Sequence, residues 1–307
     1  MTEVTTPNPS WYAEVMATER LSPHLVRIVF GGPELARYQP LGIPDEAIVL
    51  WFPRPGQKRP APVTLENDIW GHHDPETAPE GRNYTVRSFV PGEDARMTVD
   101  FVVHPGGVAG EWAQKAEIGQ ELLITRPRSW FAPPAGVKWI LAAADLTGLP
   151  ALARVIEECT EDGPAVYAMV ETVDADDLAA LPETQCHARG VDASVGTGNG
   201  LNQGALTALI AAKLPELSQQ GPGYVWYSGE AAQSREIRKL LRKEHGWPLD
   251  HVATVGYWRA DSELWDETYD RVGGDQLVQV YYDAIKRGLS DAEASELLDE
   301  EYEKAGL

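Results

Sequence analysis

Short apolar runs separated by glycine and proline fill residues 10–133 of this chain. Several short strands at this spacing are typical of a small antiparallel β-barrel, which we predict for this region. The polar stretch 66–81 is predicted to be a connection of low order. The expected strands are residues 25–30, 47–52, 84–90, 97–103 and 121–125.

Strand and helix patterns alternate over residues 137–260, which predicts a parallel sheet covered by helices, with ligands at the carboxyl ends of its strands. The glycine-rich run 194–200 has no convincing strand before it, so a flexible loop is favoured over a phosphate cradle. The expected strands are 139–143, 165–171, 224–228 and 251–257, and the expected helices are 149–158, 174–180, 202–214 and 231–245.

Residues 261–307 carry apolar positions at three- and four-residue spacing, which predicts a helical C-terminal extension. The helices should break at Gly273 and Gly274, stop at Gly288 and restart after a Ser290 cap. Two interpretations stay open. The helices form an amphipathic group that docks on the body or on a second subunit of a homo-oligomer, or they form a lid near an active site.

Charge narrows the classes of partner. The 307 residues carry a net charge of −21, which argues against nucleic acid and anionic membranes as main partners. Residues 261–307 hold 14 Asp and Glu against 4 Lys and Arg. No run of 18 apolar residues is present and the first residues are neither basic nor apolar, so we expect a cytoplasmic protein without membrane insertion.

The segment from Arg82 to Phe89 places an aromatic ring, a hydroxyl and two guanidiniums on one short extended element. These groups suit a flavin. Tyr84 can pack on the isoalloxazine, Thr85 can hydrogen-bond its reactive edge, and arginine can pair with a pyrophosphate. We predict Tyr84 and Thr85 as catalytic contacts, with Arg82 and Arg87 among the cofactor-binding residues. The alternative is an ordinary edge strand with solvated arginines.

About twenty residues later, the expected strand over 97–103 is followed by a glycine-rich turn that opens a helix. Free backbone N–H groups at such a turn make a phosphate site without any charged side chain. This second cradle favours FAD over FMN. The cofactor-binding residues expected in this segment are Val102, His104, Gly107, Ala109, Gly110 and Trp112.

Together these segments resemble the siderophore-interacting protein family, flavin reductases related to the ferredoxin–NADP reductases. The family pattern R-x-Y-T-x-R is met at residues 82–87, and H-x-x-G-P-A-S-x-W-A is met in part at 104–113, where Val108 replaces the usual proline and Gly110 the usual serine. Residues 145–151 resemble the D-E-T-A-L-P-A turn and 256–259 match G-Y-W-R. The four matches occur in the family's order over roughly residues 10–260.

The resemblance implies a two-domain enzyme in which an N-terminal antiparallel barrel (10–133) binds FAD, an α/β domain (137–260) binds NAD(P)H, and residues 261–307 form an acidic helical extension. Its activity would be the NAD(P)H-dependent reduction of a ferric siderophore, with iron release inside the cell. The resemblance places the corner Ser228-Gly229-Glu230, where an expected strand meets an expected helix, beside the nicotinamide nucleotide. Whether the electron donor is NADH or NADPH stays open. It adds Thr147, Gly229, Glu230 and Trp258 to the cofactor-binding residues.

An anionic ferric complex requires cations near the flavin, and we predict Lys58, Arg59, Arg128 and Arg259 as substrate-binding residues. Family members often carry a lysine soon after G-Y-W-R, but residues 260–263 here read Ala-Asp-Ser-Glu, which suggests a less anionic substrate. For each cation alone, a solvated surface charge is the alternative. No resident metal is expected.

Two rival functions stay open. One is a reductase that donates electrons to a small redox protein, although such acceptors are acidic and a net charge of −21 would repel them. The other is a module that holds flavin or siderophore without turnover, and its flavin would not be reduced by NADH or NADPH.

Overall fold

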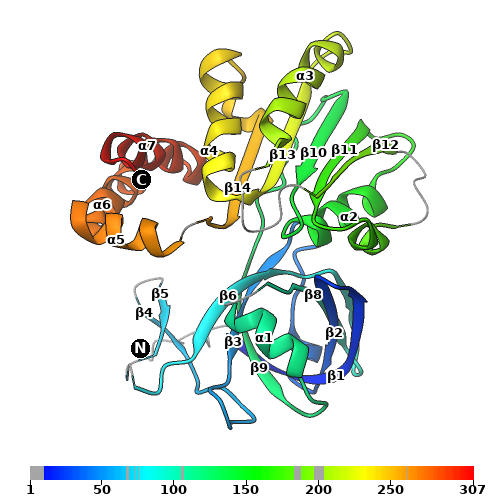
Figure 1. Cartoon of the computed structure of the whole chain (residues 1–307), viewed down its shortest axis with the longest axis vertical. Coiled ribbons are helices and arrows are strands. Elements are labelled where there is room, and N and C mark those ends of the chain that lie inside the picture. Colours follow the sequence, from blue (N-terminus) through cyan, green and yellow to red (C-terminus); the bar gives the residue numbers. More distant parts are fainter. Residues whose placement is uncertain are drawn as a thin grey trace, which may run out of the picture.

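Two sheets, each with its own hydrophobic core, organise the chain, and three helices follow at its C-terminal end (Figure 1). This computed structural model describes residues 10–66, 69–72, 74, 76–104, 107–182, 188–196, 204–260 and 262–307. The predicted order of antiparallel barrel, parallel sheet and helical extension is confirmed.

The first sheet is antiparallel throughout and curls into a half-barrel, with the strand order β6-β3-β9-β1-β2-β8-β7. Its ends approach each other where Tyr84 of β6 packs on Phe101 of β8, with ring centroids 4.5 Å apart. Helix α1 (Val108–Lys115) lies against this half-barrel (Figure 1). The strands are β1 (Ser10–Ser22), β2 (Leu25–Gly31), β3 (Ala47–Phe52), β6 (Glu80–Thr85), β7 (Ser88–Val90), β8 (Arg96–Val102) and β9 (Glu121–Arg128), and a 3-10 turn, η1 (Leu35–Arg37), follows β2.

Three details of the first domain differ from the prediction. The long strand β1 was missed, because its apolar alternation stops after Val15 and residues 16–20 are exposed. Part of the stretch expected to be of low order forms a separate two-stranded sheet, β4 (Thr64–Glu66) with β5 (Ile69–Gly71). The strand expected over 84–90 is two strands, since the chain leaves β6 after Thr85 and enters β7 at Ser88.

The second sheet is parallel, with the order β12-β11-β10-β13-β14. Alternate residues of its central strand reach opposite faces. Ile140 and Ala142 pack with helix α2, whereas Trp139 and Leu141 pack with α3 and α4. The strands are β10 (Trp139–Ala144), β11 (Ala165–Thr172), β12 (Ala188–Val195), β13 (Gly223–Glu230) and β14 (Val252–Trp258). The helices are α2 (Leu149–Glu158), α3 (Leu206–Ser218) and α4 (Ala231–Lys239), with the turns η2 (Ala175–Ala180), η3 (Leu240–Glu244) and η4 (Leu249–His251).

The prediction for the glycine-rich run was wrong in one respect. Strand β12 (Ala188–Val195) comes directly before it, as an edge strand paired only with β11 within the described residues. Its polar composition, ARGVDASV, hid it from a search for apolar runs. Residues 197–200 lie outside the described residues, so the loop itself stays a prediction.

The extension consists of α5 (Ser262–Val272), α6 (Gly274–Lys286) and α7 (Asp291–Ala305), which lie beside α4 in Figure 1. Gly273 adopts φ 71° at the break, a left-handed conformation that glycine adopts without a Cβ penalty. Ser290 caps α7 and exchanges hydrogen bonds with Glu293 in a capping box. The expected break and cap are both confirmed.

The two domains meet through buried groups, which we call the domain joint. Asp45 of the barrel domain, 0% exposed, accepts hydrogen bonds from the Trp226 indole (3.2 Å) and the Trp130 amide (3.0 Å). The Ser22 hydroxyl donates to buried Asp177 at 2.5 Å. Because these pairs are buried, they hold the two sheets in a fixed relation.

No described helix combines the length and the apolar character that crossing a bilayer requires.

Candidate functional site

The strand that carries Tyr84 and Thr85 faces the carboxyl end of the parallel sheet. Tyr257, near the end of β14, lies by Thr85 of β6. Burial raises the pKa of the Tyr257 phenol, the charge of Asp45 adds to the rise, and contact with the Thr85 hydroxyl lowers it. The predicted flavin strand and the predicted nucleotide edge are therefore adjacent, although their sequences are far apart.

The two predicted catalytic residues occupy different surroundings. The Tyr84 ring packs against the barrel core at Phe101, and burial raises the pKa of its phenol. Thr85 is 4% exposed, and its buried hydroxyl makes no hydrogen bond of ordinary geometry with the described residues. A buried hydroxyl without such a bond costs free energy, and a bound ligand that supplies one would recover it.

The glycine-rich turn lies against the same core. The ring centroid of Trp112 in α1 lies 5.9 Å from that of Phe101 in β8, and Tyr84 of β6 packs on the same Phe101 ring. No side chain caps the α1 N-terminus at Gly107, and the Trp112 indole N–H is buried without a hydrogen bond to the described residues. Free donors here fit an anionic ligand such as a dinucleotide phosphate.

Two glycines of this turn also have a packing reason. A Cβ on Gly110 would lie 2.9 Å from the Val102 carbonyl oxygen, and one on Gly107 would lie 2.7 Å from the His104 ring. These glycines let α1 approach the end of β8 closely, with Ala109 buried beside them. The uncapped N-terminus, more than the glycines themselves, supports the phosphate prediction.

The predicted arginines have protein partners. Arg82 is exposed and pairs with Glu80 at 3.0 Å. Arg87 lies beyond the end of β6 and binds Glu157 of α2 through two hydrogen bonds of 2.8 and 2.5 Å. Arg87 thus links the two domains, and its role toward a cofactor stays a prediction, as does that of Arg82.

At the carboxyl end of the central strand β10, a buried carboxylate accepts three hydrogen bonds. Asp145, 1% exposed, accepts from the Thr147 amide (2.8 Å), the Thr147 hydroxyl (2.6 Å) and the Trp258 indole (2.6 Å). Burial raises the pKa of the Asp145 carboxyl to about 6, against the lowering effect of these hydrogen bonds. The predicted residues Thr147 and Trp258 therefore both donate to the same carboxylate, that of Asp145.

The Ser-Gly-Glu corner lies next to Asp145. The Ser228 hydroxyl is buried without a hydrogen bond to the described residues. Glu230 caps α4 by accepting from the Gln233 amide at 2.8 Å. A Cβ on Gly229 would lie 2.6 Å from Asp145 Oδ2, so glycine is required here by its protein neighbours before any ligand is considered.

The four predicted substrate-binding cations lie on different elements. Arg128 donates to Asn83 at 2.6 Å and stacks 4.8 Å from the Trp130 ring. Both Arg128 and Thr85 are register partners of Ala47, so Arg128 lies close to the flavin strand. Arg59 pairs with Glu121 at 2.8 Å and stacks over Tyr12, while Lys58 is exposed. Arg259 stacks 3.4 Å from the centroid of Trp265, in the extension.

Sequence reasoning assigned no role to three groups at this site. Asp45 carries no motif, Tyr257 lies inside G-Y-W-R but only Trp258 and Arg259 were selected from it, and Trp265 looked like an ordinary apolar position of an amphipathic helix. A family pattern could have pointed to Tyr257, but nothing local distinguishes Asp45 or Trp265.

Comparisons with known proteins agree over both sheet domains. The profile of a siderophore-interacting FAD-binding domain matches residues 14–131, and that of a siderophore-interacting protein matches residues 137–261. An uncharacterized protein of Mycobacterium tuberculosis is 32% identical over 257 residues, covering 80% of this chain and 89% of that protein. An NADPH-dependent ferric-chelate reductase of Escherichia coli is 29% identical over 259 residues, covering 80% and 91%.

Among solved structures, a siderophore utilization protein from T. fusca superimposes with a TM-score of 0.65 and 30% identity, over 82% of this chain and 94% of the other. Residues 262–307 lie beyond the end of both matching profiles. The family resemblance thus covers the two sheet domains and leaves the extension to be interpreted from its own contacts.

Proposed function

Since this chain belongs to the siderophore-interacting protein family, we propose that it is an FAD-dependent oxidoreductase that uses NAD(P)H to reduce ferric siderophores. The observation that carries the proposal is the position of β6 against the carboxyl end of β14, where Thr85 lies by Tyr257. A flavin site and a nicotinamide site must share such a border for electrons to pass between them.

The chemistry explains why the enzyme needs a flavin. Reduced nicotinamide gives two electrons as hydride, and a ferric complex accepts one. Bound FAD supplies the conversion between these two steps. Hard Fe(III) is held tightly by anionic oxygen donors and Fe(II) far less well, so reduction of the complex releases the metal.

We assign the residues of the barrel domain to FAD. Tyr84 and Thr85 contact the reactive part of the ring system, the N-terminus of α1 from Gly107 to Trp112 receives the pyrophosphate, and Arg82 neutralises it. The uncapped helix supports this assignment, because the described residues provide no side-chain cap for its first N–H groups. The Thr85 hydroxyl is buried beside the Tyr257 phenol, and neither oxygen makes a hydrogen bond of ordinary geometry with the described residues.

The parallel sheet would hold NAD(P)H at its carboxyl edge. Ser228 and Gly229 at the end of β13 and Thr147 before α2 line this edge, and Asp145 fixes the Trp258 indole beside them. This placement follows the general rule that ligands bind outside the carboxyl ends of parallel strands. We propose the same division as before, with FAD bound by residues 10–133 and NAD(P)H by residues 137–260.

Lys58, Arg59, Arg128 and Arg259 are the proposed docking groups for the ferric siderophore. Arg128 has the strongest support, since Arg128 of β9 and Thr85 of β6 are both register partners of Ala47 on the strand between them, β3. We place the protein in the cytoplasm, because the reaction consumes NADH or NADPH. We retain the proposal that the C-terminal helices meet a second copy, here through exposed apolar side chains of α6 such as Ile285 at 39% exposure.

An anaerobic absorbance titration tests the function. NADH or NADPH is added to the purified protein, followed by a ferric siderophore, while the oxidised-flavin band is recorded. Bleaching and then recovery supports the reductase. Bleaching without recovery points to a different electron acceptor, such as a small redox protein, and a flavin that neither nucleotide bleaches points to a binding module.

A double variant locates the substrate. Lys58→Ala combined with Arg128→Ala should raise the KM for an anionic ferric siderophore while NADH-driven or NADPH-driven flavin reduction continues at its original rate. Lys115→Ala combined with Arg37→Ala, which also removes two exposed cations, serves as the charge-matched control. If the kinetics are unchanged, the substrate docks elsewhere.

A further inference from the structure

One contact joins the extension to the proposed substrate site. The Arg259 guanidinium lies 3.4 Å from the centroid of the Trp265 ring, in α5. Arg259 follows Tyr257 by two residues, and Tyr257 lies by Thr85, so this contact is at the border of the two domains. Trp265 lies beyond residue 261, where the family profile ends.

Trp265 is itself held by two aromatic neighbours. Its ring stacks on Tyr269, with centroids 4.8 Å apart, and meets Tyr302 of α7 edge to face at 5.9 Å. Tyr302 is 8% exposed. The indole therefore cannot turn away from Arg259 unless α7 also moves.

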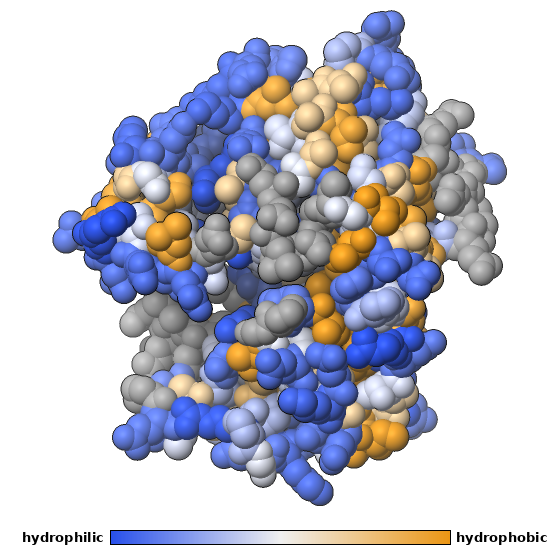
Figure 2. All heavy atoms as spheres, in the orientation of Figure 1, coloured by the Kyte–Doolittle hydropathy of each residue, from blue (hydrophilic) through white to orange (hydrophobic). Residues whose placement is uncertain are grey.

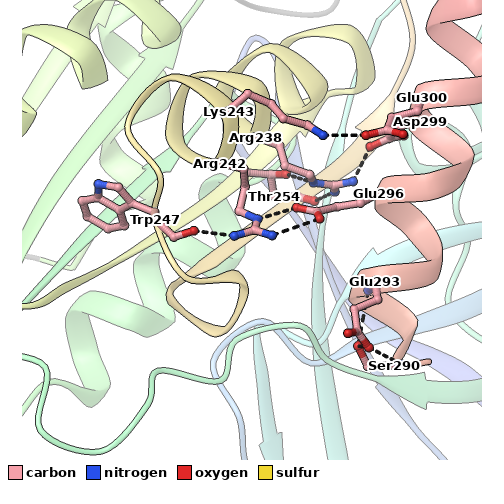
Figure 3. A network of polar contacts seen from close by, with 10 residues as sticks. All are labelled: Arg238, Arg242, Lys243, Trp247, Thr254, Ser290, Glu293, Glu296, Asp299 and Glu300. Carbon is pink, nitrogen blue, oxygen red and sulfur yellow. Dashed lines mark hydrogen bonds and ion pairs between the residues drawn. The ribbon is translucent and has the colours of Figure 1, made fainter. Parts of the chain in front are cut away.

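Helix α7 is held by charge. Its acidic residues at three- and four-residue spacing lie along one face and pair with a basic row on α4 and η3, and we call these contacts the ion-pair row (Figure 3). A cavity of about 680 Å³ lies between the helices, and its only apolar lining residues are Ala232 and Leu307. The pairs are Arg238–Asp299, Lys239–Glu303 (2.5 Å), Arg242–Glu296 (2.6 Å) and Lys243–Glu300 (2.5 Å).

Arg259 needs this support. Burial lowers the pKa of its guanidinium and the like charge of Arg235 lowers it further, while the charges of Tyr302, Glu230 and Asp266 act in the opposite direction. One guanidinium nitrogen is buried without a hydrogen bond to the described residues, so other contacts must hold the side chain in place. The indole face is one such contact, because a ring quadrupole attracts a guanidinium. An arginine held in place also loses less side-chain freedom when an anion binds.

We propose that Trp265 is a positioning residue for Arg259, so that the C-terminal extension completes the docking site for anionic ferric siderophores. The inference rests on the proposed function and adds to it a residue from a segment outside the family profile. It favours a fixed, docked extension over a mobile lid, because α7 is attached to α4 and η3 through the ion-pair row while Trp265 of α5 contacts Arg259.

The test compares two substitutions in the full-length FAD-loaded protein. Trp265→Ala removes the stack, and Trp265→Phe keeps an aromatic face. With a ferric tris-catecholate, which is anionic, Trp265→Ala should raise KM about three- to tenfold with unchanged kcat. Trp265→Phe should stay within about twofold of the original. Leu264→Ala, an exposed neighbour on the same helix, is the control and should change nothing.

Two further measurements make the result specific. With a ferric tris-hydroxamate of zero charge, Trp265→Ala should leave KM unchanged, since Arg259 then has no anion to attract. In an Arg259→Gln background, Trp265→Ala should have no additional effect. Equal KM for all variants, or additive effects of the two substitutions, would overturn the inference.

Binding without turnover separates this inference from the proposed function. Ferric tris-catecholate is titrated into the oxidised protein with no NAD(P)H present. Wild-type protein that binds and reduces the complex, with Trp265→Ala unchanged in both, overturns the role of Trp265 alone. Wild-type protein that neither binds nor reduces either complex overturns the proposed function.

Discussion

The domain joint and the attachment of the extension use opposite kinds of contact. At the joint, Asp45 and Asp177 are 0% exposed, and Leu25 of the barrel domain is buried in the core of the second domain. In the ion-pair row, Lys239 and Glu303 expose 55% and 65% of their side chains, and even the least exposed pair, Arg242 with Glu296, exposes 25% and 19%. None of the hydrophobic core clusters of the described residues includes a residue of the extension.

This difference has a mechanical meaning. A buried, hydrogen-bonded joint tolerates little displacement, which suits two sites that must exchange electrons at fixed separation. Exposed ion pairs are individually weak and are screened by salt, so the extension is held by many small contributions. The face of the extension that is visible in Figure 2 is largely hydrophilic with some hydrophobic residues.

The largest effect is expected from breaking the joint. Asp45→Ala removes the acceptor of the Ser129 hydroxyl, the Trp130 amide and the Trp226 indole. We expect the free energy of unfolding to fall by about 3 kcal/mol, since buried donors left without acceptors cost about 1–3 kcal/mol each. Urea denaturation measures this. Glu303→Ala, in an exposed pair, is the control, and an equal loss there would erase the contrast.

The second effect depends on pH and concerns Asp145, the buried carboxyl at the carboxyl end of β10 in the parallel-sheet domain. The Asp145 pKa is raised by burial to about 6, above the unfolded value of about 3.9. Between these values the folded state binds more protons, so stability rises as the pH falls from 6 toward 4, by up to about 2 kcal/mol. Asp145→Asn should abolish this rise.

Unfolding free energies at pH 7 and pH 4.5 for both proteins test the sign. Asp162→Asn, which removes an exposed acid, should leave the difference between the two pH values as it is in the original protein. Parallel pH dependence in Asp145→Asn and the original protein would show that this carboxyl does not titrate in the stated range.

The third effect concerns the proposed FAD site in the barrel domain. Tyr84→Ala removes a ring that packs on Phe101, and we expect flavin content in the purified protein to fall about tenfold. Tyr84→Phe keeps the ring and should retain flavin. The absorbance ratio of flavin to protein gives the result, and full flavin content in the alanine variant would remove Tyr84 from the site.

The smallest effect is expected in the ion-pair row. Glu300→Gln breaks the pair with Lys243, in which the two side chains are 41% and 60% exposed, and should cost less than about 0.5 kcal/mol. Glu296→Gln, whose side chain is 19% exposed, should cost more. Thermal unfolding at low and high salt compares them, and a large, salt-independent loss in Glu300→Gln would mean that the extension is held in another way.

The sequence predicted those parts of the fold that depend on short spacing. The apolar strand at residues 139–143 and the helix at 149–158 were confirmed, and so was the Ser290 cap, because a cap, a turn or a helical face is decided within four residues. Strands β1 and β12 were missed, since their exposed or edge positions carry polar residues that an apolar search does not detect.

What the sequence determined by itself is the two-domain class, the family and the segments that carry Tyr84, Gly107 and Trp258. What only the tertiary structure decided is which distant groups meet. Arg87 meets Glu157, Tyr257 meets Thr85, and Arg259 meets Trp265 rather than open solvent. The physical reason is that the free energy of a buried polar or aromatic contact depends on neighbours brought together by the packing of whole sheets, and no local pattern records those neighbours.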